Sequence, residues 1–213
     1  MIQVFIVDDH PIVRRGLRSS LADLPDIKVI DEASDGAEAI SKVRASKPDV
    51  VLLDISMPGK TGLEVLKQLH AEMPAIRVLI LSTYPEKQYA MRCFGSGAAG
   101  YLTKESAPEE LVTAIRRVAE GRKYVSASLA ELLATEIHSD PVKMAHEYLS
   151  DREFEVLCLI GRGKTVSQIA KILSLSLPTI NTYRSRILDK MNLQSSAQLI
   201  HYVLENKLVD KVD

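Results

Sequence analysis

The sequence predicts an α/β fold class: a doubly wound, five-stranded parallel sheet, followed by a small all-helical domain. Three observations support this prediction. Short apolar runs alternate with segments of helical periodicity up to about residue 122, the alternation then stops, and the chain is helical again from residue 149. With 213 residues, the chain has room for two small domains that each bury a core.

The five predicted strands are short runs rich in Val, Ile and Leu, at residues 3–7, 27–31, 50–53, 77–81 and 100–103. A strand with one wet face alternates apolar and polar residues, whereas these runs are apolar almost throughout. We therefore expect strands that are buried on both faces, as in a parallel sheet covered by helices.

A segment with helical periodicity follows each strand, at residues 11–24, 36–46, 61–73, 86–97 and 108–121. Apolar residues recur in these segments at the spacing of one helix face, as in Leu111, Ile115 and Val118. The alternation predicts five consecutive βα units with helices on both faces of the sheet.

The alternating pattern ends after Gly121. Residues 126–138 are amphipathic enough for a short helix, and residues 139–148 carry turn residues and few apolar ones. The sequence thus divides into a first domain at residues 1–122, a linker with a short helix at 123–148, and a second domain at 149–213.

The second domain is predicted to be helical at residues 150–163, 165–176, 176–193 and 195–209. Ser150 and Glu153 have the spacing of a capping box at the start of the first of these helices. In the third, Ser176 is the expected cap and Pro178 lies in the first turn, where its missing N–H is tolerated. Its buried stripe is expected to comprise Ile180, Ile187 and Met191.

The charges of the chain are unevenly placed. The net charge is −1, yet residues 162–190 hold six basic residues and a single acid, which predicts a polyanionic partner for that segment. The two cysteines are too few for a disulfide framework and fall in apolar surroundings, as expected of buried, reduced thiols. No apolar run approaches the ~20 residues that cross a bilayer, and no leader is evident, so we expect a cytoplasmic protein without membrane contact.

Reactive side chains follow four of the five predicted strands at their carboxyl ends. In a parallel sheet these ends share one edge, where ligands bind. Three neighbouring carboxylates would raise one another's pKa values unless a cation neutralised them, and Mg²⁺ accepts such ligands. A carboxylate can also attack phosphorus to form an aspartyl-phosphate. The residues expected at this edge are Asp8, Asp9, Asp54, Ser82, Thr83 and Lys104.

Each of these residues also has a simpler interpretation. Asp9 or His10 could cap the helix that Pro11 begins. The two hydroxyls could be ordinary strand-end residues, and Lys104 a solvated loop lysine. Asp54 is harder to explain in this way, because an apolar strand ends on it and the chain turns directly afterwards.

Residues 1–122 resemble the receiver domain of bacterial two-component response regulators, a flavodoxin-like fold. The resemblance rests on "VDDHPIVRRGL", "PDVVLLDISMPGKTGLEVL", "VLILST" and "GAAGYLTKESAPEELVTAIRRV". It implies that a sensor histidine kinase phosphorylates Asp54. It also implies Mg²⁺ binding by Asp8, Asp9, Asp54 and the Ser56 carbonyl, and phosphoryl contact and switching by Lys104, Ser82, Thr83 and Tyr101.

Polar side chains occupy the amino-terminal half of the capped third helix of the second domain, as expected for a helix that enters the major groove. A solvated helix face is the simpler alternative. However, "LSDREFEVLCLIGRGKTVSQIAKILSLSLPTINTYRSRILDKMNL" resembles the LuxR-type helix-turn-helix of the NarL/FixJ class, and within it the GacA/UvrY group.

This second resemblance implies a set of DNA contacts. Base edges would be read by Asn181, Thr182 and Ser185, and phosphates approached by Lys164, Thr179, Arg184 and Arg186. Pro178 and Asp189 depart from the lysine or arginine that is commoner at their positions. The last helix would carry a dimer contact, with Val203 as its central residue.

Together these features predict a response regulator that acts as a transcription factor. Phosphorylation of Asp54 would favour a homodimer on paired half-sites of double-stranded promoter DNA, with RNA polymerase as a further partner. One alternative is an aspartyl-phosphate phosphatase, but such an enzyme would need an acid where Ser56 stands. Another is a regulator that binds RNA or protein, although the aromatic residues of the second domain are not clustered as stacking on RNA requires.

Overall fold

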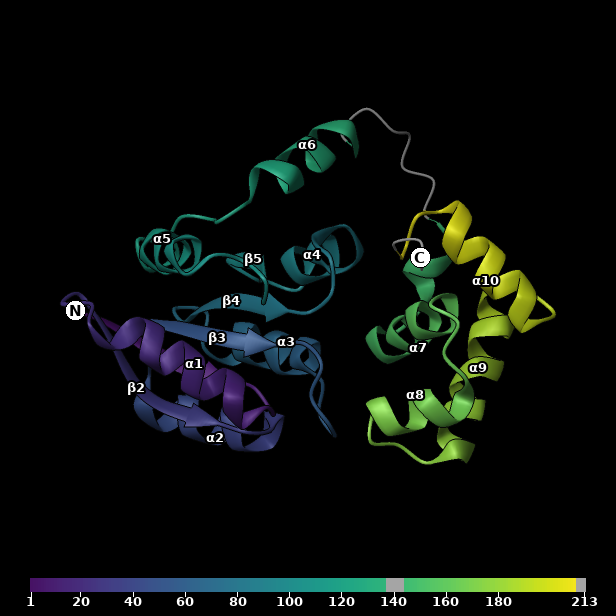
Figure 1. Ribbon diagram of the computed structural model, residues 1–213, viewed down its shortest axis with the longest axis horizontal. Helices are drawn as coiled ribbons and strands as arrows, with labels where there is room; N and C mark the ends of the chain where they lie inside the picture. The colour runs from purple at the N-terminus through teal and green to yellow at the C-terminus, as the bar shows by residue number, and fades with distance from the viewer. Residues whose placement is uncertain (137–143, 210–213) are drawn as a thin grey trace. The chain divides into compact units, whose positions relative to one another are not determined.

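The computed structural model describes residues 1–136 and 144–209 (Figure 1). The chain divides into two compact units, Met1–Ile137 and His138–Asp213, and each is described by itself. Within the described ranges, no helix has the length and apolar character needed to span a membrane.

The first unit contains a five-stranded sheet in the order β2-β1-β3-β4-β5, with every neighbouring pair parallel. The predicted fold class is therefore confirmed. The third strand includes Asp54 itself, so its carboxylate is held by the sheet and not by a loop. The bounds are β1 Ile2–Val7, β2 Ile27–Ala33, β3 Val50–Asp54, β4 Arg77–Ser82 and β5 Gly100–Thr103.

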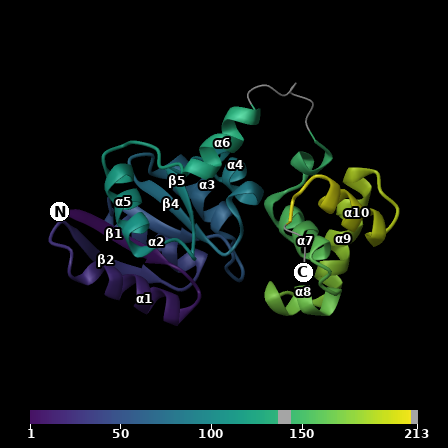
Figure 2. The same cartoon turned by 45° about the horizontal axis from the view of Figure 1, so that its top comes forward.

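Helices cover both faces of this sheet (Figures 1 and 2). One face packs against α1 (Pro11–Ala22) and α5 (Pro108–Ala119) in a cluster that includes Leu21 and Ile115. The opposite face carries α2 (Gly36–Ser46), α3 (Gly62–Glu72) and α4 (Glu86–Gly95). Successive strand residues point to opposite faces, so strands that are covered on both sides are apolar throughout.

The start of α3 is pressed against the end of β3. Thr61 and Glu64 form a capping box, and the Gly62 N–H donates to the Ile55 carbonyl at 3.0 Å. A Cβ atom on Gly62 would lie 1.9 Å from the Asp54 carbonyl oxygen, so no other residue fits here without moving the strand end. The tight approach therefore fixes the backbone on which Asp54 stands.

The segment after α5 folds back onto the first unit. The Tyr124 N–H donates to the Ala99 carbonyl at 2.9 Å, and Tyr124 forms a parallel bridge to Gly100 at the edge of β5. A short helix, α6 (Ala127–Glu136), then packs against α4. The stretch predicted as a linker thus contains the short helix that its amphipathic pattern indicated.

The second unit consists of helices packed around α7. A 3-10 turn η1 (Ala145–Tyr148) precedes α7 (Asp151–Gly161), α8 (Val166–Ile172), α9 (Leu177–Met191) and α10 (Ser196–Glu205). The predicted capping box between Ser150 and Glu153 is present. Glu153 also accepts a hydrogen bond from Lys190 at 2.7 Å, which joins the end of α9 to the start of α7. Ile180, Ile187 and Met191 form the predicted buried stripe.

The close contact at Gly62 leads to a stability prediction. Gly62→Ala should lower the free energy of unfolding of the first unit by at least ~2 kcal/mol, because the strand end must shift to admit a methyl group. Gly16→Ala is the matched control: the added methyl meets nothing within 4 Å, and in mid-helix it should be neutral or stabilising by up to ~1 kcal/mol. Urea unfolding followed by circular dichroism measures the stability of both variants. Equal effects of the two substitutions would contradict the close approach of Gly62 to the end of β3.

Candidate metal centre and nucleic-acid interface

The parallel topology brings the predicted edge residues together at the carboxyl ends of the strands. Asp8 follows β1, Asp54 ends β3, Ser82 ends β4 and Lys104 follows β5. Strand β3 lies between β1 and β4, which places Asp54 at the middle of the cluster. The edge is thus assembled from residues that are distant in sequence.

A single lysine connects the two buried carboxylates of this edge. Lys104 Nζ lies 2.6 Å from Asp8 Oδ2 and 2.8 Å from Asp54 Oδ2, and both aspartates are only 1–2% exposed. Backbone groups occupy the other oxygens: the His10 N–H donates to Asp8 Oδ1 at 2.8 Å, and the Ser56 N–H donates to Asp54 Oδ1 at 3.2 Å. Lys104 is therefore not a solvated loop lysine.

Burial dominates the protonation of Asp54. It raises the pKa of this carboxyl; the Lys104 ammonium opposes the rise and the Asp8 carboxylate adds to it, and the resulting pKa is about 6. Burial acts to lower the pKa of Lys104, but the Asp54 and Asp8 carboxylates outweigh it and hold that pKa above its usual value. The edge has more negative than positive charge, as a cation site requires.

The donor set at this edge fits a divalent cation. One potential ligand atom from each of Asp8, Asp9, His10 and Asp54 lies within 4.8 Å of the others. Asp9 Oδ1 is buried and accepts no hydrogen bond from the described residues; His10 Nδ1 lies 2.8 Å away without hydrogen-bond geometry. A buried carboxylate oxygen without a hydrogen-bond donor, next to two further carboxylates, suits a hard cation such as Mg²⁺.

His10 is a member of this group that the sequence did not suggest as a ligand. The sequence predicts only a residue at the start of a helix here, and His10 does occupy the N-cap position of α1. Its side chain makes no capping hydrogen bond there and lies beside the carboxylates instead. Its position next to Asp9 was the only available signal.

The two hydroxyl residues at the end of β4 differ in their surroundings. Ser82 is fully buried, and its Oγ accepts a hydrogen bond from the Tyr84 N–H at 3.0 Å, whereas Thr83 is exposed. The Tyr101 ring is buried and its hydroxyl donates to the Tyr84 carbonyl at 2.8 Å. Burial raises the pKa of the Tyr101 phenol far above its usual range, so it remains a hydrogen-bond donor.

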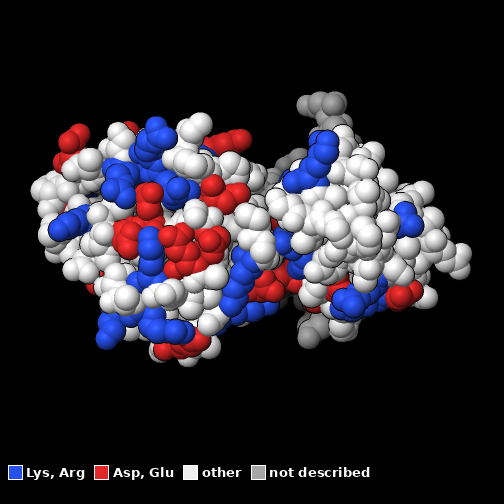
Figure 3. Space-filling view, turned by 90° about the horizontal axis from the view of Figure 1, so that it is seen from below, with Lys and Arg blue, Asp and Glu red and all other residues white. Residues whose placement is uncertain are grey.

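Most of the side chains predicted to contact DNA lie on the surface of the second unit. On α9, Asn181, Thr182, Ser185 and Arg186 are exposed, Thr179 is partly exposed, and Lys164 is exposed before α8. In the view of Figure 3, Lys and Arg side chains lie at the margins of the second unit, whereas over the first unit they intermingle with Asp and Glu. A polar, exposed face on α9 is available for a ligand.

Two predicted residues of the second unit have other surroundings than expected. Arg184 is partly buried, and its Nη1 lies 3.4 Å from Ser196 Oγ of α10, so it helps to join two helices. Val203 is fully buried, and its Cγ1 occupies the space that a Cβ on Gly161 would need. A side chain without exposed surface cannot centre a contact between chains in this conformation, so the placement of Val203 is corrected to the core.

Comparison with known families defines the class of protein. Residues 4–116 match the response regulator receiver domain, and residues 147–203 match the bacterial regulatory proteins of the luxR family. The chain therefore belongs to the response regulators that join a receiver domain to a luxR-family domain. From here on, the first unit is called the receiver.

Within this family, the chain is similar along its whole length to two well-defined regulators. It is 37% identical over 209 residues to the response regulator UvrY of Escherichia coli strain K12, covering 98% of this chain and 96% of UvrY. It is 38% identical over 211 residues to the response regulator GacA of Pseudomonas viridiflava, covering 99% of each. The predicted likeness to the GacA/UvrY group is confirmed.

Solved structures show the same architecture. RcsB of Salmonella enterica serovar Typhimurium, bound to promoter rprA in the presence of the phosphomimetic BeF3-, is 26% identical, with a TM-score of 0.65 over 95% of this chain and 98% of RcsB. A LuxR-family two-component response regulator from Aurantimonas is 37% identical, with a TM-score of 0.61 over 65% of this chain and 99% of that chain.

The raised pKa of Asp54 predicts how stability depends on pH. In metal-free protein the folded state binds this proton more tightly than the unfolded state, so stability contributed by the proton falls as pH rises from ~4 to ~7. Relative to Asp54→Asn, the wild type should lose ~2–3 kcal/mol across that interval. Denaturant unfolding with a chelator present measures the difference, and parallel profiles for the two proteins would contradict the buried, protonatable carboxyl.

Proposed function

We propose that this protein is a transcription regulator whose binding to promoter DNA is controlled by phosphorylation of Asp54. The observation that carries the proposal is the buried Asp54 carboxylate, which contacts Lys104 and belongs to a group of side chains that could hold a cation. A structural ion pair would need neither the second buried carboxylate of Asp8 nor the unsatisfied oxygen of Asp9. The family membership supports the same interpretation.

The site is suited to accept a phosphoryl group from the phosphohistidine of a sensor kinase. An Asp54 oxygen attacks phosphorus, the new O–P bond forms as the P–N bond to histidine breaks, and the kinase imidazole leaves. Asp8, Asp9, Asp54 and the Ser56 carbonyl would hold Mg²⁺, which supplies positive charge beside the phosphoryl oxygens. Lys104 then exchanges its contact with Asp54 for one with a phosphoryl oxygen.

Ser82 is placed to report the new phosphoryl group. Its hydroxyl now accepts the Tyr84 N–H. A phosphoryl oxygen is a strong acceptor, so the Ser82 hydroxyl would turn toward it and donate. The Tyr84 carbonyl also accepts a hydrogen bond from the Tyr101 hydroxyl. A movement of Ser82 would therefore change the positions of the loop between β4 and α4 and of the Tyr101 ring.

The output of the protein is DNA binding by α9. Its amino-terminal half is capped by Ser176 and presents Asn181, Thr182, Ser185 and Arg186 to solvent. Asn and Ser side chains read base edges, while Arg186 and Lys164 would contact phosphates. RcsB, which shares the architecture, has been solved bound to a promoter.

The proposed partners follow from this role. A sensor histidine kinase supplies the phosphoryl group, double-stranded promoter DNA receives α9, and a phosphorylated homodimer occupies paired half-sites in the cytoplasm. The exposed side of α10, including Leu204, is the surface we assign to the dimer in place of Val203. RNA polymerase is the further partner of a regulator that acts at promoters.

The first experiment joins the two halves of the proposal. Purified protein is mixed with sheared genomic DNA at one fixed salt concentration, with and without Mg²⁺ and beryllofluoride as the phosphoryl mimic. Inverted half-sites should be enriched with the mimic, and Asp54→Asn should remove the dependence on the mimic. Enrichment that is equal in both samples would refute phosphorylation control, and no enrichment in either would refute DNA output.

The separate roles proposed for Asn181 on α9 and Lys164 before α8 give a second prediction. Asn181→Ala should cost ~1–3 kcal/mol on the selected site and relax sequence preference, because a base contact is lost. Lys164→Ala should weaken binding to all sequences alike and reduce the salt slope of log K by about 1. Fluorescence anisotropy on selected and scrambled duplexes at several salt concentrations separates these outcomes, and equal losses on both duplexes from both variants would contradict base reading.

A further inference from the structure

The short helix α6 is anchored to the receiver by a carboxylate–hydroxyl cluster. This cluster lies next to the loop between β4 and α4, residues 83–85, which is called the switch loop below. Glu86 is the first residue of α4, and its Oε2 accepts hydrogen bonds from Ser126 Oγ at 2.5 Å and from Ser128 Oγ at 2.7 Å. Ser126 Oγ also accepts the Leu129 N–H at 3.2 Å. The same hydroxyl therefore begins α6 and joins it to α4.

Apolar contact supports this attachment. Leu129, in the first turn of α6, is only 1% exposed, although the helix lies at the surface of the receiver. Helices α6 and α4 are in contact, and Figure 2 shows them next to each other. The first turn of α6 is thus attached to the receiver by the buried Leu129 side chain and to the start of α4 by the Glu86 carboxylate.

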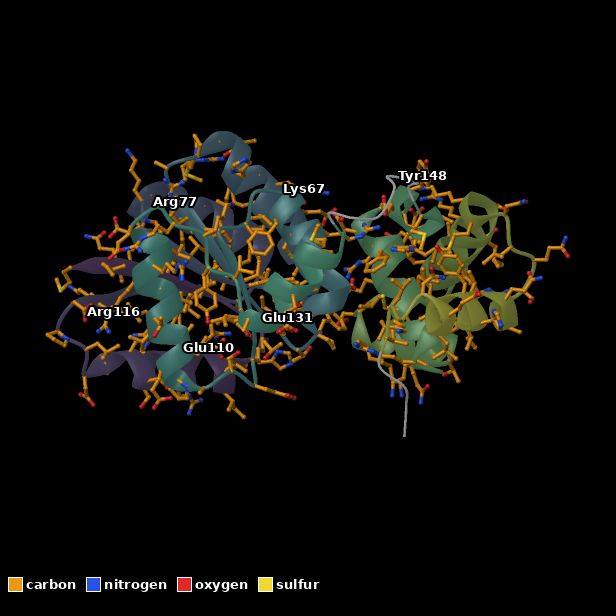
Figure 4. All side chains as sticks on the ribbon, turned by 90° about the horizontal axis from the view of Figure 1, so that it is seen from above. Lys67, Arg77, Glu110, Arg116, Glu131 and Tyr148 are labelled. Atoms are coloured by element: carbon orange, nitrogen blue, oxygen red, sulfur yellow. The ribbon has the colours of Figure 1, made fainter. Side chains whose placement is uncertain are left out.

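The chain leading into α6 is fixed independently. The Tyr124 N–H donates to Ala99, and the Tyr124 hydroxyl donates to Glu110 of α5 at 2.8 Å, the residue labelled in Figure 4. Lys123 Nζ donates a hydrogen bond to the Ala98 carbonyl. Residues 123–124 are therefore held by β5 and α5. A displacement of α4 would move α6 while the residues that lead into α6 stay in place.

Glu86 lies two residues after Tyr84, which takes part in both hydrogen bonds of the switch loop. The Tyr84 carbonyl accepts a hydrogen bond from the Tyr101 hydroxyl, and the Tyr84 N–H donates one to Ser82 Oγ. Its ring also stacks on Tyr89 of α4, with ring centroids 4.7 Å apart. Hydrogen bonds therefore join Ser82 to Tyr84, two residues of backbone lead from Tyr84 to Glu86, and hydrogen bonds join Glu86 to Ser126 and Ser128.

We propose that Glu86 is a positioning residue that couples the switch loop to the short helix α6. This inference rests on the proposed phosphorylation of Asp54. When Ser82 moves to donate to the phosphoryl group, the Tyr84 N–H that it accepts moves with it. The start of α4 then shifts, and the Glu86 carboxylate transmits the shift to the two serine hydroxyls that hold α6. The signal then reaches the linker through a defined contact as well as through the receiver surface.

Hydrogen–deuterium exchange on the full chain, with and without Mg²⁺ and beryllofluoride, tests this coupling. In the wild type, the mimic should change exchange rates both in the β4–α4 loop and in the first turns of α6, by at least about threefold. Glu86→Ala should keep the response of the loop and lose the response of α6. Ser126→Ala with Ser128→Ala should have the same effect, and combining all three changes should add nothing further.

Glu109→Ala is the matched control. Glu109 is also an acid in the first turn of a receiver helix, α5, but among the described residues its side chain forms no hydrogen bond or ion pair with α6. This variant should respond as the wild type does. A thermal melt of each variant checks that the receiver is folded.

The outcomes separate this inference from the function on which it rests. If the mimic leaves the β4–α4 loop unchanged in the wild type, the phosphorylation proposal fails. If the loop responds but α6 does not, or if α6 still responds in Glu86→Ala, the coupling role of Glu86 is refuted and the proposed function stands.

Discussion

The contact on which the receiver edge depends is the ammonium of Lys104 between the buried carboxylates of Asp8 and Asp54. Two carboxylates with almost no solvent exposure are stable together only if positive charge is at hand. Lys104 supplies this positive charge and lowers the pKa of Asp54, but burial, with a smaller contribution from the Asp8 carboxylate, still raises that pKa to about 6. The edge is therefore held in a state that a cation and a phosphoryl group can each rearrange.

The sheet provides the rigid frame for this contact. The aspartates and the lysine follow strands that are paired along their length, and the close approach of Gly62 fixes the end of β3. The loop after β4 is attached to this frame through Tyr84, whose N–H donates to Ser82 Oγ and whose carbonyl accepts from the Tyr101 hydroxyl. Under the proposed function, the fixed end of β3 holds the phosphoacceptor in the geometry that the chemistry needs, and the response falls to the loop beside it.

The fold and most of the candidate site could be predicted because strand ends are readable in sequence. The apolar runs that precede Asp54 and Lys104 show that both residues lie at strand ends. In a parallel sheet these ends share one edge, so the two side chains are expected to meet there. Contacts that depend on side-chain direction could not be predicted in this way. Helical spacing did not show that Val203 faces the core, and nothing near Glu86 in the sequence indicates that Ser126 and Ser128 would bond to it.

The pairing of Tyr124 with Gly100 has a consequence for how the receiver behaves when it is separated from the rest of the chain. Strand β5 is at the edge of the sheet, and part of its outer side is covered by the residues that follow α5. A fragment ending at residue 122 would keep all five strands but expose backbone groups on that side. Open strand edges recruit other strands, so self-association of such a fragment would reflect the missing cover and not a native dimer.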